Sequence, residues 1–135
     1  MALVTWDRSY SVKVARCDND HKKLFTLINI FHDAMAQGKG ADVVQQTVQE
    51  LLDYTRVHFS AEEGLMQKAG YAGLAAHRAQ HQEFVRQVEQ FQSDLQASKT
   101  GKAVAVLGFL KDWLSKHIKQ TDQKYSAQLN AHGIS

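Results

Sequence analysis

The sequence contains histidine and carboxylate side chains at spacings that suit metal binding. His58 is followed by Glu62 and His77 by His81, each four residues later. Residues four apart on a helix lie on the same face, one turn from each other. The set is completed by His21 alone and by His117 with Asp122. Burying neutral imidazoles with carboxylates in an apolar interior is costly unless something coordinates them, so this pattern predicts a metal site.

The types of ligand limit which metal can bind. Imidazole with carboxylate and no thiolate suits iron, copper, zinc, nickel or manganese, whereas calcium and magnesium prefer oxygen alone. The single cysteine, Cys17, excludes a thiolate-based zinc or iron–sulfur site within one chain, and we interpret it as a tolerated small residue. The candidate ligands exceed one tetrahedral or octahedral site. We therefore expect two metal ions that share bridging carboxylates, as in di-iron helical bundles.

Four amphipathic runs must position these side chains. Apolar residues recur at three- and four-residue intervals in four stretches separated by glycine-containing or polar turns, which predicts four helices. We expect Asp18, Asn19 and Asp20 to cap the first helix and Asp42 the second. The second helix continues to about Met66. The third covers the stripe from 74 to 95, and the fourth follows 98–101 and frays from about 131.

Four helices joined by short turns favour an all-α fold, an antiparallel up-down-up-down four-helix bundle. The length of 135 residues suits a single domain over 1–135, with 44% hydrophobic residues and no proline to break the helices. We expect an extended N-terminal arm over 1–17, anchored by Trp6, and the bundle over about 18–130.

This topology brings all the candidate ligands to one end of the bundle. The starts of the first and third helices lie beside the ends of the second and fourth, and the candidate ligands occupy those positions. The step of five residues from His117 to Asp122 is about 140° on a regular helix. We therefore predict a π-bulge or local unwinding that turns Asp122 inward.

Other polar residues near these motifs receive simpler interpretations. Glu63 points away from Glu62 by helical geometry and is expected to be solvated. His32 lies about 16 Å along the helix from His21, so it is a packing or surface residue, with a weaker possibility of a proton or channel role. His132, in the C-terminal tail, is expected to be exposed.

Charge and hydropathy exclude several classes of partner. The 16 Lys and Arg are interspersed with 14 Asp and Glu, so nucleic acid is not expected to bind. The longest apolar stretch, 103–110, is too short to cross a membrane, and the N-terminus lacks the features of a signal peptide. We expect a cytoplasmic protein. The expected surface mixes polar, charged and apolar residues and shows no obvious interface for a second copy, which favours a monomer.

The ordered motifs resemble those of the hemerythrin family, specifically its single-domain bacterial members. The resemblance covers nearly the whole chain and rests on Trp6, on Asp18 three residues before His21, and on the three ligand segments at 58–63, 77–81 and 117–122. One departure is Asp20, which stands where a glutamine often precedes the first ligand histidine.

The resemblance implies a non-haem di-iron centre that binds dioxygen reversibly. It assigns His77, His81 and His117 to one iron and His21 and His58 to the other, with Glu62 and Asp122 bridging them beside an oxo or hydroxo group. The second iron keeps an open position for dioxygen. An apolar lining is needed to slow the release of peroxide that would leave inert ferric iron. Our candidates for this lining are Leu114, Ile28, Phe25 and Trp113.

Several functions could use such a centre. The leading one is oxygen carriage, storage or buffering by a protein that is not an enzyme, with an oxygen-consuming enzyme as a candidate recipient. Histidine dominates here, whereas oxygen-activating di-iron enzymes are rich in carboxylates and Glu-x-x-His pairs. The alternatives are a di-iron oxidase, a peroxidase, a nitric oxide scavenger, or an oxygen sensor that acts through a separate partner. Iron storage is least favoured because one closed site leaves no room for a mineral.

Overall fold

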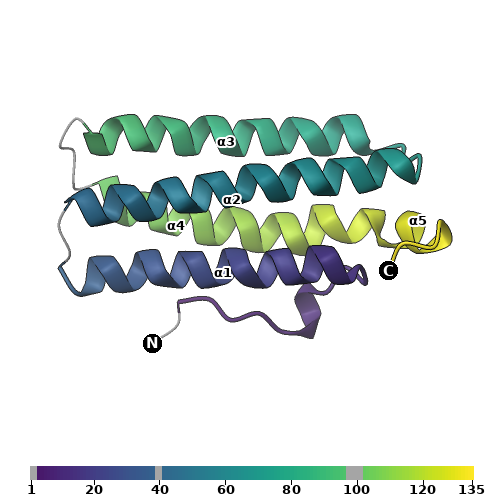
Figure 1. Cartoon of the computed structure of the whole chain (residues 1–135), viewed down its shortest axis with the longest axis horizontal. Helices are drawn as coiled ribbons and strands as arrows, with labels where there is room; N and C mark the ends of the chain where they lie inside the picture. Colours follow the sequence, from purple (N-terminus) through teal and green to yellow (C-terminus); the bar gives the residue numbers. More distant parts are fainter. Residues whose placement is uncertain (1–2, 39–40, 97–101) are drawn as a thin grey trace.

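Four long helices run antiparallel in a bundle (Figure 1). The computed structural model describes residues 3–38, 41–96 and 102–135. The long helices are α1 (Ala15–Ala36), α2 (Ala41–Lys68), α3 (Leu74–Gln96) and α4 (Lys102–Lys116). After α4 the chain forms a π segment, η2 (His117–Thr121), a 3-10 turn, η3 (Asp122–Tyr125), and a short helix, α5 (Ser126–Ala131). The expected all-α four-helix bundle is confirmed.

The core follows the apolar stripes of the sequence. Side chains from all four helices are almost wholly buried, among them Leu24, Ile28, Leu51, Phe84, Val88, Leu110 and Leu114. Each such side chain contributes about 1.5–3 kcal/mol when it leaves water. This continuous core fixes the rotation of each helix and therefore directs the remaining polar positions of the same stripes inward.

The first helix begins earlier than the cap residues predict. Its first residue is Ala15, so Asp18 lies in the first turn and the predicted cap at 18–20 is wrong. The Asp18 carboxylate instead accepts hydrogen bonds from the preceding arm, from the Val12 N–H at 2.8 Å and the Ser11 hydroxyl at 2.6 Å. An acidic side chain in the first turn also suits the helix dipole. The backbone of Asp42 lies within α2, but its side chain, and thus the predicted cap there, lies outside the described residues.

The N-terminal arm runs along α1 and contains one 3-10 turn, η1 (Arg8–Tyr10) (Figure 1). Trp6 is half-buried, with the Lys22 ammonium 4.4 Å above its ring. A stronger tether comes from Asn29, whose side-chain oxygen accepts from the N–H groups of Leu3 and Val4 at 2.9 and 3.0 Å. Its amide also donates to the Val4 carbonyl at 2.9 Å. The arm is therefore anchored to α1 by the hydrogen bonds of Asn29 as well as by Trp6, and the sequence pattern did not reveal the contribution of Asn29.

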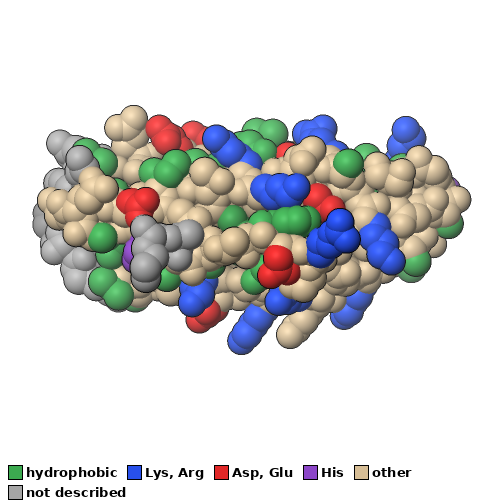
Figure 2. Space-filling view, turned by 90° about the horizontal axis from the view of Figure 1, so that it is seen from below, with side chains coloured by type: hydrophobic (Ala, Val, Ile, Leu, Met, Phe, Trp, Pro, Cys, Tyr) green, Lys and Arg blue, Asp and Glu red, His purple; other side chains and the backbone are tan. Residues whose placement is uncertain are grey.

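The surface carries charges of both signs close together, as Figure 2 shows for one face. Within the described part of the chain, no helix is long and apolar enough to span a membrane.

Candidate metal centre

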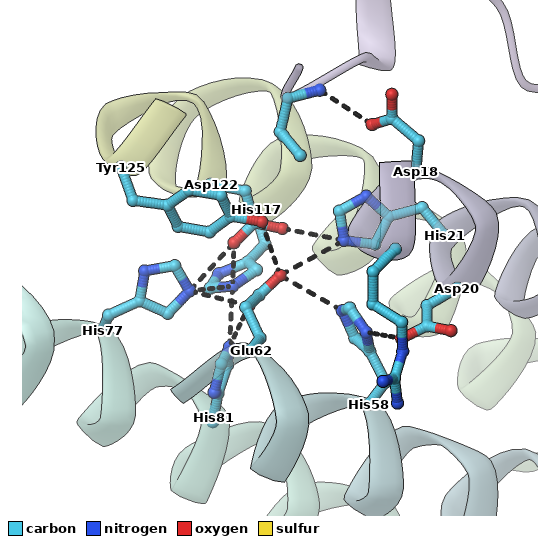
Figure 3. Close-up of polar contacts among 12 residues, drawn as sticks. Asp18, Asp20, His21, His58, Glu62, His77, His81, His117, Asp122 and Tyr125 are labelled. Carbon is cyan, nitrogen blue, oxygen red and sulfur yellow. Dashed lines mark hydrogen bonds and ion pairs between the residues drawn. The ribbon is translucent and has the colours of Figure 1, made fainter. Parts of the chain in front are cut away.

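The predicted ligand side chains meet inside one end of the bundle (Figure 3). Each of them is at most 4% exposed. They come from α1, α2, α3 and the irregular segment after α4, and they are His21, His58, Glu62, His77, His81, His117 and Asp122. The structure thus brings together every predicted ligand residue.

Three histidines and two carboxylate oxygens form the first group. The His117 Nε2 lies 3.1 Å from the Nε2 atoms of both His77 and His81. Glu62 Oε1 lies 3.1 Å from the Nε2 atoms of the same two histidines. Asp122 Oδ1 lies 2.9 Å from His77 Nε2 and 3.0 Å from His117 Nε2. One ligand atom from each of the five residues fits within a mutual separation of 4.8 Å.

The second group uses the other oxygen of each carboxylate. Glu62 Oε2 lies 3.4 Å from His21 Nε2 and 3.2 Å from His58 Nε2. Asp122 Oδ2 lies 3.2 Å from His21 Nε2. Glu62 and Asp122 therefore each present one oxygen to each histidine group, which is the arrangement of a carboxylate that bridges two metal ions.

Two observations test whether these residues fit metal ions. Adjacent ligand atoms that lie about 2.1 Å from one ion at right angles are about 3 Å apart, as the nitrogens and oxygens are here. In addition, neither oxygen of Asp122 accepts a hydrogen bond, and His21 Nε2 has no hydrogen-bond partner, although all three atoms are buried. Buried polar atoms normally have partners, so these atoms suit a cation.

The outer nitrogens of three of the histidines donate to nearby acceptors, each at 2.9 Å. The pairs are His58 Nδ1 to Asp20, His81 Nδ1 to Glu63, and His117 Nδ1 to the Gln80 side-chain oxygen. A proton held on Nδ1 leaves the Nε2 lone pair free to face the centre. These partners therefore fix the tautomer that metal binding requires.

The expectation that Glu63 is solvated is wrong. Its side chain is only 19% exposed, and it binds both His81 and the Arg78 guanidinium, the latter at 2.8 Å. Glu63 does turn away from the centre along α2, but that direction faces α3, where His81 presents its outer nitrogen. Asp20 likewise acts on His58 of another helix and not on its neighbour His21. A carboxylate adjacent to a ligand residue was the available signal in both cases.

Tyr125 is a further polar residue at the centre, and the sequence analysis did not single it out. It is fully buried, and its hydroxyl donates to Glu62 Oε2 at 2.8 Å (Figure 3). Its ring stacks on that of His77 with centroids 5.7 Å apart. Burial and the nearby Glu62 and Asp122 carboxylates raise the Tyr125 pKa well above its ordinary value, so the phenol keeps its proton.

The two central carboxylates favour protonation of His21 and His77 in the metal-free protein. Burial lowers the pKa of His21, but contacts with Asp122 and Glu62 outweigh it and raise the pKa to about 10. The same balance raises the pKa of His77 to about 9. Burial raises the pKa of Glu62, yet the surrounding histidines hold it well below its ordinary value. Metal ions must therefore displace protons from His21 and His77.

The irregular segment after α4 directs Asp122 inward. The Asp122 N–H donates to the carbonyl of His117, five residues earlier, so the helix widens into one π turn at 117–121. The predicted π-bulge is confirmed. A regular helix would have turned the carboxylate away from the imidazole of His117.

Besides Tyr125 on His77, aromatic rings pack directly on His117 and His81. Trp113, one of the expected lining residues, stacks on His117 with centroids 4.3 Å apart. Phe59, which the sequence analysis did not single out, stacks on His81 at 3.7 Å. The other expected lining residues, Leu114, Ile28 and Phe25, are buried in the core.

Two further histidines lie apart from the centre, and the single cysteine is unreactive. The His32 side chain is 32% exposed and lies 3.6 Å from the carboxylate of Asp33. His132 is exposed, and its ring hydrogen-bonds to the Gln128 carbonyl. Cys17 is buried, and burial raises the pKa of its thiol strongly, so it stays protonated and unreactive.

Comparisons with known proteins agree with this architecture. The family described as "Hemerythrin HHE cation binding domain" matches residues 12–129. The bacteriohemerythrin of Methylococcus capsulatus is 36% identical over 132 residues, which is 97% of this chain and 100% of that protein. The myohemerythrin of Sipunculus nudus is 33% identical and covers 92% of each chain. A crystal structure of wild-type hemerythrin superposes with a TM-score of 0.86 at 35% identity, covering 95% of this chain and 98% of that one. With its buried histidine–carboxylate centre and this match over most of its length, the chain belongs to the hemerythrin family.

Proposed function

We propose that the protein holds two iron ions in the buried centre and binds dioxygen there reversibly, for oxygen carriage, storage or buffering without net chemistry. The observation that carries the proposal is the way Glu62 and Asp122 each give one oxygen to a group of three histidines and one to a group of two. The family's description as cation binding and the names of the relatives support it.

Each iron would have its own histidines. His77, His81 and His117 would hold one ion, His21 and His58 the other, and the two carboxylates would bridge them. A bound iron pair would supply the electrons that dioxygen needs in order to bind and would recover them on release. The protein's part is to fix the donor atoms and keep the surroundings dry.

The unequal donor sets support an open position on one side of the centre. The three-histidine group presents five protein donor atoms, one from each residue. The other group presents only the Nε2 atoms of His21 and His58 with Glu62 Oε2 and Asp122 Oδ2. The side of His21 and His58 therefore leaves more room for an external ligand, and we assign dioxygen to that side.

The surrounding residues favour storage over turnover. Tyr125 keeps its proton and stays bonded to Glu62, and the thiol of Cys17 is protonated. Apolar and aromatic side chains cover the histidines, including Phe59 and Trp113. Excluding water slows the loss of bound oxygen as peroxide, which would leave ferric iron behind.

The test is anaerobic loading with ferrous iron, an iron count, and optical spectra through repeated cycles of oxygenation and deoxygenation. Two irons per chain with a visible band that disappears without oxygen and returns with it would support the proposal. Prompt irreversible conversion to a ferric spectrum would favour an oxidase, peroxidase or nitric oxide scavenger. The same spectra are recorded for His21→Ala, which removes a candidate ligand. His132→Ala, a change at an exposed histidine outside the centre, is its matched control.

A further inference from the structure

The N-terminal arm is tied to the segment that follows Asp122 by three consecutive backbone carbonyls. We call residues 11–13 the clamp segment; their carbonyls accept hydrogen bonds from side chains more than a hundred residues later in the chain. The donors are Gln123 Nε2 at 2.8 Å, the Ser126 hydroxyl at 2.6 Å and Asn130 Nδ2 at 3.0 Å. All three donors lie in η3 or α5, the two short elements that begin at Asp122.

The other side of the clamp segment is bound to the start of α1. Asp18 accepts from the Val12 N–H and the Ser11 hydroxyl, and Asp18 lies three residues before His21 (Figure 3). The clamp segment therefore connects two parts of the chain that each carry a candidate ligand: the first turn of α1 with His21, and the irregular segment with Asp122.

The backbone of the clamp segment is in a conformation that has to be held by its surroundings. Lys13 has a φ of 59°, in the left-handed region that non-glycine residues rarely adopt. Such strain persists only where packing and hydrogen bonds over-determine it. Here Val12 and Val14 on either side are buried, and the Lys13 carbonyl accepts from Asn130.

Asp122 is the candidate ligand that most needs outside support. Its two oxygens accept no hydrogen bonds, whereas Glu62 accepts one from Tyr125. Its backbone leaves a π turn, a rare arrangement that is seldom extended. The position of its carboxylate therefore depends on the backbone on both sides of it, which is the π turn before it and η3 and α5 after it, and the clamp segment holds η3 and α5.

We propose that Gln123, Ser126 and Asn130 are positioning residues that, through the clamp segment, keep Asp122 between the two histidine groups. The arm thereby controls how firmly the centre retains metal, although it contributes no ligand. This inference rests on the proposed metal centre, in which Asp122 is one of two bridging carboxylates.

The test removes the three donors together, as Gln123→Ala, Ser126→Ala and Asn130→Ala in one chain. Alanine is a good helix former, so any loosening does not come from helix propensity. The probe is cobalt(II) alone, whose visible spectrum reports the ligand set, followed by its loss to a chelator. We expect a changed spectrum and metal loss faster by about tenfold or more, the scale found when outer partners of ligands are removed.

The matched control is Asn29→Ala. It also removes three hydrogen bonds to the arm, but at Leu3 and Val4, away from the clamp segment. We expect the cobalt spectrum and the rate of metal loss to match those of the unmodified protein. Equal acceleration by the control would overturn the proposal, because it would show that any loosening of the arm suffices.

Hydrogen exchange on the metal-free protein gives a second, metal-independent readout. Backbone amides of 118–126 should exchange faster in the triple variant while amides of α2 do not change. Should the triple variant fail to fold, Ser126→Ala alone should show smaller changes in the same direction. Unchanged exchange and unchanged cobalt loss would overturn the clamp proposal. If the unmodified protein binds no cobalt pair, the proposed centre fails, and exchange at 118–126 still decides the clamp.

Discussion

Removing the Tyr125 hydroxyl should lower the free energy of unfolding of the metal-free protein, because that buried hydroxyl donates a hydrogen bond to a buried carboxylate. The Tyr125 hydroxyl donates to Glu62 Oε2 at 2.8 Å, and Tyr125 and Glu62 are 0% and 1% exposed. A hydrogen bond to a charged group contributes roughly 1.5–3 kcal/mol. Tyr125→Phe keeps the ring and its stacking on His77, so almost no cavity forms. We therefore expect the free energy of unfolding to fall by about 2 kcal/mol.

The assay is urea unfolding of the metal-free protein at neutral pH, followed by circular dichroism. Tyr10→Phe is the matched control, because the Tyr10 ring packs on Phe25 and no carboxylate of the centre contacts it. The Glu62 pKa is held below its ordinary value, so its ionised form contributes stability above about pH 4.5 and loses it as the pH falls through the lower, folded-state pKa. The effect of Tyr125→Phe should shrink over that acidic range. A loss no larger than that of Tyr10→Phe at neutral pH would refute the reasoning.

Three further predictions concern the centre itself. His58→Ala should lower the metal content below two ions per chain by elemental analysis, while His132→Ala should leave it unchanged. Because the His21 and His77 pKa values are raised to about 10 and 9, their protonated forms stabilise the metal-free protein below about pH 6.5, and this contribution is lost as the pH rises toward 9–10. Urea unfolding should therefore give a lower free energy of unfolding at pH 9 than at pH 6. Metal binding at pH 7 should release protons in a weakly buffered titration, and no release would contradict the assigned protonation of the two histidines. Glu63→Ala removes the acceptor of the His81 Nδ1 proton and should weaken metal binding by about 10- to 100-fold in a competition titration, and an affinity equal to that of the unmodified protein would show that the hydrogen bond to His81 is dispensable.

Periodicity in the sequence predicts the fold and the candidate ligands because both depend on local geometry. The apolar stripes place the four helices, and the four-residue steps from His58 to Glu62 and from His77 to His81 put each pair on one inward face. The five-residue step to Asp122 even predicts the π turn, since a regular helix could not direct both side chains inward.

Only the tertiary structure decides which side chains support those ligands. Asp20 meets His58 and Glu63 meets His81 across helix interfaces, and such contacts depend on how neighbouring helices are rotated and how far they are offset. The early start of α1 at Ala15 depends on the arm, which takes up the Asp18 carboxylate that would otherwise be free to cap.

The sequence by itself therefore determined the four-helix topology and the set of inward histidines and carboxylates, because a helix repeats every 3.6 residues and a bundle with short turns alternates direction. The tertiary structure alone decided that Tyr125 bonds to Glu62 and that residues 11–13 hold the segment after Asp122. Those contacts join residues up to 117 positions apart, and no local periodicity specifies a pairing over that distance.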